Sequence, residues 1–112
     1  MEVEEHPGIR KDLKKLKRYP TAEESLRSWA RLFCVKGLAE TPGIEQFNEF
    51  GNERVYKARV IPLKENVGKS QGYRLAFQVK SAHSIKLLVF SRHGIYTHER
   101  EMIAWVKERL LS

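Results

Sequence analysis

Apolar residues near the start of the chain recur at helical spacing. Ile9, Leu13 and Leu16 are separated by lysines and arginines, a pattern typical of one face of an amphipathic helix. Pro20 cannot continue such a helix, because proline lacks a backbone N–H and clashes with the preceding turn. The pattern therefore predicts a short first helix that ends before Pro20.

A second helix is predicted directly after this break. Thr21 and Glu24 have the T-x-x-E spacing of a capping box, in which each side chain accepts a hydrogen bond from the other residue's backbone. An apolar stripe follows at helical spacing: Leu26, Trp29 and Phe33. We expect this helix to end near Gly37 and to pair with the first helix as a hairpin. Residues 39–53 show no clear period, so we expect a connecting loop there.

Three strands are predicted over residues 55–61, 73–80 and 85–92. The first two alternate strictly, so Lys57 and Arg59 share one face, and Arg74 on the second strand falls on that face too. In the third strand both alternating sets of positions are apolar, as expected of a strand covered on both faces. Counting along it from Ile85 assigns Arg92 to the basic face as well. The short connections between these strands predict an antiparallel sheet.

A last helix is predicted with Thr97 as its N-cap and Glu99 in its first turn. Its apolar residues recur at helical spacing: Met102, Ile103, Val106 and Leu110. We therefore expect an α+β fold with two N-terminal helices, a curved antiparallel sheet and a C-terminal helix. A chain of 112 residues that is 41% apolar has material for one modest core, so residues 1–112 are expected to form a single domain.

The positive charge is concentrated on the predicted strands. Residues 54–92 hold nine bases and one acid, Glu65, whereas the segments on either side are nearly neutral, and the whole chain has a net charge of +7. The charge is therefore fixed on a sheet and not spread along a tail, which favours a surface that binds phosphate groups. RNA is the partner that this pattern favours most.

Several other classes of site are excluded by the sequence. The lone cysteine, Cys34, cannot form an internal disulfide, and we expect it to be a small buried residue. The four histidines are scattered, so no metal site is predicted. Gly68, Lys69 and Ser70 resemble the end of a phosphate loop, but Leu63 stands where its first glycine belongs, and no cofactor is predicted. Without a membrane span or a signal peptide, a cytoplasmic location is expected.

The strand sequences resemble a known family. Residues 55–60 (VYKARV), 68–77 (GKSQGYRLAF) and 85–92 (IKLLVFSR) look like the strand core of RelE-type toxins of toxin–antitoxin systems, and the predicted helices fit that family too. The resemblance covers nearly the whole chain, and the Gly-Tyr-Arg motif that ends in Arg74 is its most specific part. It implies a microbial-RNase-like fold, cleavage of messenger RNA on the ribosome, and inhibition by a tightly bound acidic antitoxin.

The resemblance also implies roles for individual residues. The expected reaction uses side chains alone: the ribose 2′-hydroxyl attacks the neighbouring phosphate, and fixed cations stabilise the charge that develops. Lys57 and Arg59 match the family's basic pair on the first long strand, and Arg74 matches the arginine that holds the scissile phosphate. The other candidate catalytic residues lie at or after the end of the last strand: Arg92, His93 and Tyr96. The remaining lysines of the basic segment are candidates for binding the RNA backbone: Lys69, Lys80 and Lys86.

Other interpretations of the same residues remain open at this point. Basic residues on a sheet are often only solvated, Arg74 could pair with Glu65, and Tyr96 could pack at the helix entrance. The superfamily to which RelE-type toxins belong also contains ParE-like poisons of DNA gyrase. That branch usually lacks such a group of basic residues on its strands. A third possibility is a module that binds RNA or an antitoxin on the same scaffold and has lost turnover.

Overall fold

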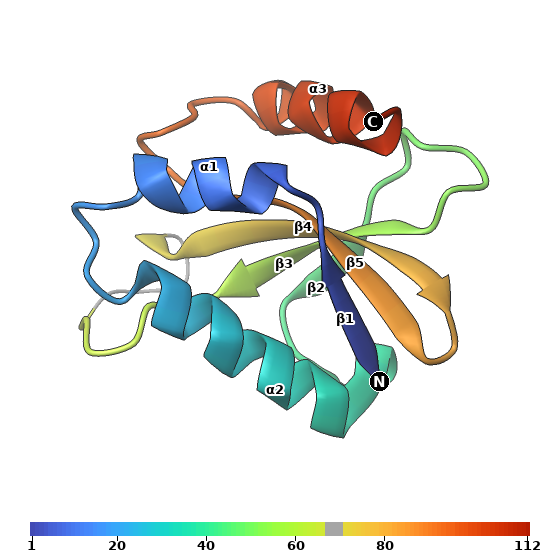
Figure 1. Ribbon diagram of the computed structural model, residues 1–112, viewed down its shortest axis with the longest axis horizontal. Coiled ribbons are helices and arrows are strands. Elements are labelled where there is room, and N and C mark those ends of the chain that lie inside the picture. Colours follow the sequence, from blue (N-terminus) through green and yellow to red (C-terminus); the bar gives the residue numbers. More distant parts are fainter. Residues whose placement is uncertain (67–70) are drawn as a thin grey trace.

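The computed structural model describes residues 1–66 and 71–112, which form a mixed α+β fold with three helices and a five-stranded, curved open sheet (Figure 1). The elements follow one another along the chain: β1 (Glu2–Glu5), α1 (Gly8–Lys15), α2 (Ala22–Glu40), β2 (Ile44–Gln46), β3 (Val55–Val60), β4 (Tyr73–Ser81), β5 (Ser84–Arg92) and α3 (Glu99–Leu110). The order of strands in the sheet is β1-β5-β4-β3-β2. The three long strands and the closing helix agree with the prediction to within a few residues.

Two short strands at the edges of the sheet were not predicted. β2 lies within the segment expected to be a loop and pairs antiparallel with β3. β1 pairs parallel with β5, so the sheet is mixed and not purely antiparallel as expected. The sequence of β1, EVEE, contains one apolar residue, and its partner lies some eighty positions along the chain. A local period cannot reveal such a pairing.

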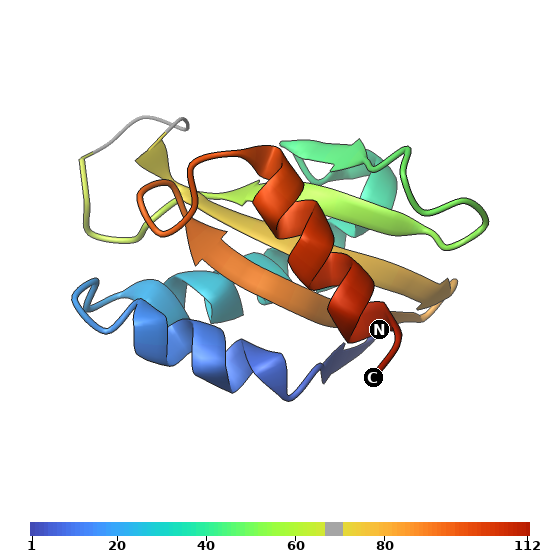
Figure 2. The same ribbon diagram turned by 90° about the horizontal axis from the view of Figure 1, so that it is seen from above.

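Helices cover both faces of the sheet, and α3 crosses one face diagonally over β3, β4 and β5 (Figure 2). Leu26, Trp29 and Phe33 of α2 pack on the opposite face with Leu75 and Phe77 of β4. Met102 and Val106 of α3 form a second core with residues of β3, β4 and β5: Val55, Ala76, Leu88 and Val89. The sheet is therefore buried on two sides, and only the parts of it beyond the ends of α3 can bear a polar site.

Three local predictions about the helices are wrong. α1 packs along β5 and α2 packs under β3, so the two helices do not form the expected hairpin. Thr21 is the N-cap of α2, but its hydroxyl donates to the Leu63 carbonyl oxygen at 2.8 Å, and the capping box is not formed. At α3 the N-cap is His98, one residue later than expected.

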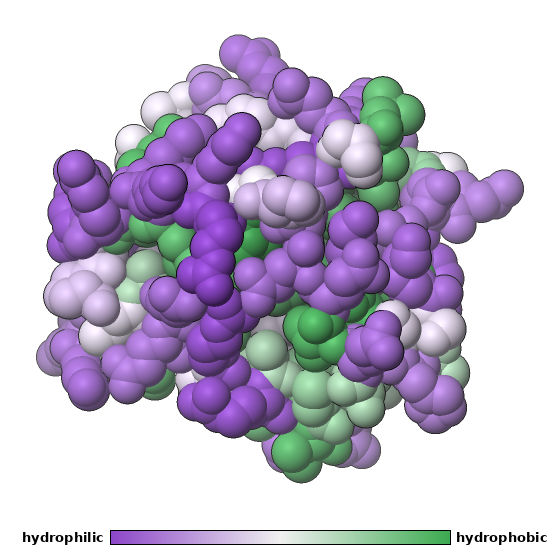
Figure 3. Space-filling view, viewed as in Figure 1, coloured by the Kyte–Doolittle hydropathy of each residue, from purple (hydrophilic) through white to green (hydrophobic). Residues whose placement is uncertain are grey.

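The outer surface of α2 is partly apolar. Cys34 is exposed and not buried as expected, because it lies about 100° around the helix from the buried Phe33. Val35 is 84% exposed, and Figure 3 shows hydrophobic side chains over the C-terminal half of α2. Among the described residues, no helix is long and apolar enough to cross a membrane.

Candidate nucleic-acid interface

Three of the predicted basic residues lie together on the α3 face of the sheet. In the β3–β4 ladder Arg59 is directly opposite Arg74, and Lys57 is opposite Ala76, which lies in the core beneath α3. Residues that face each other across an antiparallel pair point to the same side. The prediction that Lys57, Arg59 and Arg74 share a face is therefore confirmed.

These residues line a pocket of about 200 Å³ beside the start of α3. We call it the basic pocket and define it by the residues that line it: Gly43, Glu45, Lys57, Ala58, Arg59, Arg74, His93, Tyr96 and Glu99. Five of the six predicted catalytic residues are among them, and they come from β3, β4 and the segment between β5 and α3. The fold thus brings together groups that are nearly forty positions apart in the sequence.

Lys57 lies between two carboxylates of the basic pocket. Its ammonium group forms an ion pair and hydrogen bond with Glu99 and lies 3.9 Å from a carboxylate oxygen of Glu45. It also lies 5.4 Å from the centroid of the Phe47 ring. The side chain of Lys57 is only 26% exposed, so these partners hold it in place within the pocket.

The sequence analysis missed the two acidic residues of this pocket. Glu99 was assigned only to the first turn of a helix, and Glu45 lay in the presumed loop. Glu45 faces Lys57 across the β2–β3 ladder, so this contact could be predicted only if β2 were known. Both carboxylates reduce the net positive charge of the pocket and compete with phosphate for Lys57.

Arg59 and Arg74 differ in their surroundings. Arg59 is exposed, and its side chain forms no ion pair among the described residues. Arg74 is half-buried, and its Nη1 donates to the Tyr73 carbonyl oxygen at 3.3 Å. A guanidinium group has five N–H donors and can bind an anion through two hydrogen bonds at once. These two arginines therefore supply most of the pocket's capacity for bidentate binding of an anion.

His93 and Tyr96 form the third wall of the basic pocket. Their rings stack with centroids 5.1 Å apart and an interplanar angle of 28°, with His93 exposed and Tyr96 buried. A tight turn brings them together, in which the Ile95 N–H donates to the Arg92 carbonyl oxygen at 2.9 Å and Gly94 has φ of +105°. Glycine adopts such a backbone conformation without strain.

The chemical state of Tyr96 follows from its burial. Burial raises the pKa of the Tyr96 phenol, and the nearby Glu99 carboxylate raises it further, whereas Arg74 opposes the shift. The phenol therefore keeps its proton at neutral pH and can serve as a hydrogen-bond donor. Tyr96 also packs edge to face against Trp105, so it has a structural role as well.

Arg92 is not part of the basic pocket, and its predicted place on the basic face is wrong. β5 has an extra residue where Ala76 pairs with Val89 but Phe77 pairs with Leu87, so Leu88 forms a β-bulge. Beyond this bulge the alternation of β5 is inverted, and Arg92 pairs with Tyr73, on the α2 face. The apolar sequence of β5 gave no sign of the extra residue.

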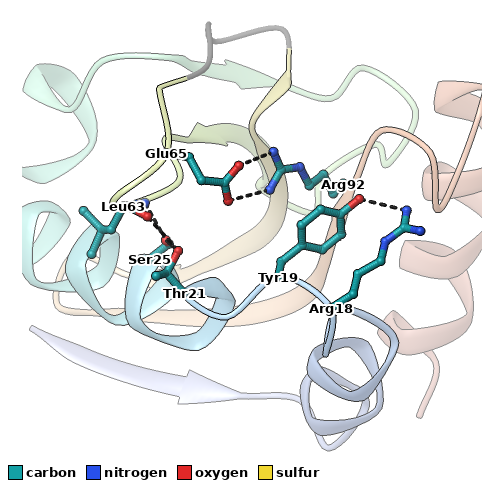
Figure 4. A network of polar contacts seen from close by, with 7 residues as sticks. All are labelled: Arg18, Tyr19, Thr21, Ser25, Leu63, Glu65 and Arg92. Atoms are coloured by element: carbon teal, nitrogen blue, oxygen red, sulfur yellow. Dashed lines mark hydrogen bonds and ion pairs between the residues drawn. The ribbon is translucent and has the colours of Figure 1, made fainter.

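Arg92 is itself buried and instead binds Glu65 in a partly buried cluster (Figure 4). Its two terminal nitrogens donate to the two Glu65 carboxylate oxygens at 3.0 and 2.8 Å. Its guanidinium carbon lies 4.3 Å from the centroid of the Tyr19 ring and 4.9 Å from that of Tyr73. An ion pair between Glu65 and Arg74 was one of the alternatives that the sequence left open, and in the structure both carboxylate oxygens of Glu65 accept from Arg92.

Two of the three predicted RNA-binding lysines, Lys80 and Lys86, lie outside the basic pocket. Lys80 and Lys86 line a separate polar hollow near the end of α3 with Arg109, and Lys86 lies 3.8 Å from Glu4. They are therefore separated from the basic pocket by the length of α3. Lys69 lies outside the described residues.

The basic pocket has the groups that phosphodiester chemistry needs. Two guanidinium groups and one ammonium group can bind phosphate oxygens, an imidazole can accept or donate a proton, and a protonated phenol can donate a hydrogen bond. Within residues 1–66 and 71–112, no three His, Cys, Asp or Glu side chains are grouped so that they could hold a metal ion. No family model, no curated protein and no solved structure matches the chain in the comparisons with known proteins.

Proposed function

We propose that this protein is a RelE-type toxin that binds messenger RNA in the basic pocket and cleaves it on the ribosome in the cytoplasm. The observation that carries this proposal is the convergence of Lys57, Arg59 and Arg74 beside the stacked pair of His93 and Tyr96. The scaffold would then be the microbial-RNase-like fold. An acidic antitoxin would be its natural inhibitor.

The geometry supports a division of roles among these residues. Arg74 is half-buried and lines the pocket, so it is well placed to hold the scissile phosphate with a fork of donors. Arg59, exposed on the neighbouring strand, would bind the same or the next phosphate. Charge that is fixed before the substrate arrives stabilises the transition state without reorganisation.

Proton transfer would involve the other side of the pocket. His93 is exposed and can approach the leaving 5′-oxygen or the 2′-hydroxyl, while the Tyr96 ring beneath it fixes its plane. The products of such a reaction are a 2′,3′-cyclic phosphate and a free 5′-hydroxyl. Lys57 would join the phosphate site once RNA competes with Glu99 for its ammonium group.

One observation favours a second candidate, an RNA-binding module without turnover. Arg92 is paired with Glu65 outside the pocket, and Lys57 is paired with Glu99, so fewer cations face the substrate than the family pattern implies. Such a module would bind RNA with an affinity that falls steeply with salt and would give no cleaved product.

Induction of the wild type and of Arg74→Ala in bacteria tests the proposal, with primer extension on an abundant messenger RNA. The wild type should arrest growth and produce cleavage ends within minutes, whereas Arg74→Ala should lose both while keeping its circular dichroism spectrum. Arg31→Ala is the matched control, because it removes an equal charge from exposed α2. Full cleavage by Arg74→Ala would refute the proposed enzyme, and RNA binding by the wild type without cleavage would establish the module.

A further inference from the structure

The basic pocket contains two carboxylates that phosphate binding does not explain. Glu45 and Glu99 line it together with the three cations, and a carboxylate repels a phosphate group at short range. The two acids differ in their partners. Glu99 forms a hydrogen bond with Lys57, whereas a Glu45 oxygen lies 3.9 Å from the same ammonium group. In the described parts of the chain no group donates a hydrogen bond to the Glu45 carboxylate, and its side chain is 66% exposed, so both of its oxygens can accept from a ligand.

The register of the sheet places Glu45 one row away from the two arginines. Glu45 is opposite Lys57 in the β2–β3 ladder, and Arg59 is opposite Arg74 in the next row on the same face. Residues on one face of a strand are two positions apart, so these two rows are separated by about 7 Å. This spacing is of the order of the distance between the phosphate of a nucleotide and its base. A nucleotide whose phosphate is bound by the arginines can therefore place its base at Glu45.

The other walls of the basic pocket leave room for a base. Gly43 lies beside Arg59, and its carbonyl oxygen accepts from the Arg59 N–H at 3.0 Å. A Cβ atom at Gly43, which has φ of +78°, would lie 3.4 Å from the Cβ of Arg59, so glycine keeps this end of the arginine row open. The exposed His93 ring, stacked on Tyr96, is a flat surface of the kind on which unpaired bases stack.

The chemistry of a carboxylate selects one base. Guanine has two N–H donors side by side on its Watson–Crick edge, N1–H and the N2 amino group, and these match the two oxygens of a carboxylate. Adenine and cytosine have an acceptor nitrogen next to the amino group, and uracil has one N–H between two carbonyl oxygens. In each of these three bases an acceptor would face a carboxylate oxygen, which is repulsive. A carboxylate therefore favours guanine.

We propose that Glu45 recognises a guanine base next to the phosphate bound by Arg59 and Arg74, so that the basic pocket selects guanine in single-stranded RNA. This inference rests on the proposed function for its substrate, RNA, and adds a base preference to it. The ammonium group of Lys57 lies between Glu45 and Glu99 and offsets part of their repulsion of the phosphate.

Binding of RNA that cannot be cleaved tests the base preference without turnover. The probes are fluorescein-labelled trinucleotides UNU with a 2′-O-methyl group on every ribose, in which N is one of the four bases or hypoxanthine. In fluorescence anisotropy with the whole protein, we expect the guanine probe to bind about fivefold or more tightly than the adenine, cytosine and uracil probes, as one bidentate contact gives. Hypoxanthine lacks the N2 amino group, so its probe should have an intermediate affinity. Equal affinities for all probes would overturn the proposal, as would the absence of saturable binding of the guanine probe.

Variants of the protein separate base recognition from charge. Glu45→Gln should weaken binding of the guanine probe by about fivefold or more, although the loss of a negative charge favours any phosphate. A glutamine amide pairs with adenine through one donor and one acceptor, so the adenine probe should bind more tightly than before. Glu49→Gln is the matched control, since it removes the same charge from an exposed position between β2 and β3 outside the basic pocket, and it should keep the guanine preference. An unchanged preference in Glu45→Gln, or an equal loss of it in Glu49→Gln, would overturn the proposal.

Mapping of cleavage ends separates a failure of this inference from a failure of the proposed enzyme. In wild-type cells the ends should lie next to guanine more often than the composition of the messenger RNA predicts, and Glu45→Gln should lose this bias. Cleavage that depends on Arg74 but has no guanine bias would overturn the base recognition and leave the enzyme. Guanine-selective binding without any cleavage would refute the enzyme and support the base recognition.

Discussion

Arg59 and Arg74 lie directly opposite each other on the neighbouring strands β3 and β4. Like charges in this position destabilise a sheet, whereas opposite charges or a Thr pair would stabilise it. A polyanion bound at this pair would reduce the repulsion between the two guanidinium groups, which links the stability of the sheet to the proposed binding of RNA.

Replacing Arg59 by glutamine should therefore separate stability from binding. We expect the free energy of unfolding to rise by about 0.2–1 kcal/mol, because the repulsion between the strands is removed. The affinity for RNA should fall, and the dependence of binding on salt should become less steep by about one phosphate contact. Urea unfolding and filter binding at several salt concentrations measure the two quantities.

Arg31→Gln provides the control for this prediction, since it removes the same charge from an exposed position of α2 outside the β3–β4 ladder. Its unfolding free energy should stay within about 0.5 kcal/mol of the wild type. A loss of stability in Arg59→Gln would contradict the interpretation of the pair as a functional compromise.

The positions that the sequence predicted well are those with strict alternation. Lys57, Arg59 and Arg74 lie on strands where one apolar set faces α2, so the parity of every residue was fixed. The face of Arg92 was predicted wrongly because β5 has apolar residues on both faces. A one-residue bulge at Leu88 therefore leaves its hydrophobic pattern unchanged. Glu99 and Glu45 were missed because their partner, Lys57, lies in a different element and is not close to either in the sequence.

The bulge itself has a physical support that the sequence could not reveal. The carbonyl oxygen of Leu88 accepts from Arg109 at 2.6 Å, and the N–H of Phe90 donates to Asp12 at 2.8 Å. Asp12 and Arg109 are joined by two hydrogen bonds of 2.6 and 2.8 Å. Backbone groups left without partners by the extra residue are thus satisfied by an ion pair between α1 and α3.

Breaking this pair should be costly. Asp12→Ala removes the anionic partner of Arg109, whose side chain is only 16% exposed, and leaves the Phe90 N–H without its acceptor. We therefore expect a loss of about 3–5 kcal/mol in the free energy of unfolding. The double variant Asp12→Ala/Arg109→Met should lose less than the sum of the two single variants, because no charge is left unpaired. Urea unfolding of the wild type, the two single variants and the double variant gives this double-mutant cycle. Additive losses of unfolding free energy would show that Asp12 and Arg109 do not stabilise the fold as a pair.

A second ion pair, between Arg92 and Glu65, connects β5 to the loop after β3. Glu65→Gln should destabilise the protein by about 1–3 kcal/mol, because Arg92 is only 8% exposed and would lose its anionic partner. The matched control on the same loop is Lys64→Gln, whose pair with Glu24 at 3.7 Å is exposed and should contribute less than about 1 kcal/mol. Equal losses in the two variants would show that burial does not matter here.

This pair also predicts a dependence on pH. The hydrogen bonds from Arg92 hold the pKa of Glu65 below its ordinary value of 4.5. In acid the unfolded chain therefore binds the proton first, and the contribution of Glu65 is complete above pH 4.5 and is lost as the pH falls from there through the lowered pKa. Glu65→Gln should remove the part of the decrease in unfolding free energy at acidic pH that comes from Glu65. Urea unfolding at a series of pH values measures this difference.

His6 provides a separate titration at higher pH. Its Nδ1 accepts a hydrogen bond from the Gly8 N–H at 2.9 Å at the start of α1, and its Nε2 lies 2.7 Å from the Ser112 hydroxyl. Burial lowers the pKa of His6 from 6.5, and the nearby charges of Arg109 and Lys86 lower it further, against an opposing effect of Asp12. The neutral ring is thus the form that the fold requires, because a protonated Nδ1 cannot accept.

Below pH 6.5 the unfolded chain binds a proton at His6 before the folded chain does, so stability should fall as the pH decreases from 6.5 to the lowered pKa and change little from this source below it. His6→Asn should flatten this part of the profile, because the Asn oxygen can accept from the Gly8 N–H without titrating. His83→Asn, in the hairpin turn between β4 and β5, is the matched control and should retain the slope. A wild-type profile that is flat between pH 5 and 7, or one that His83→Asn flattens instead, would refute the assignment to His6.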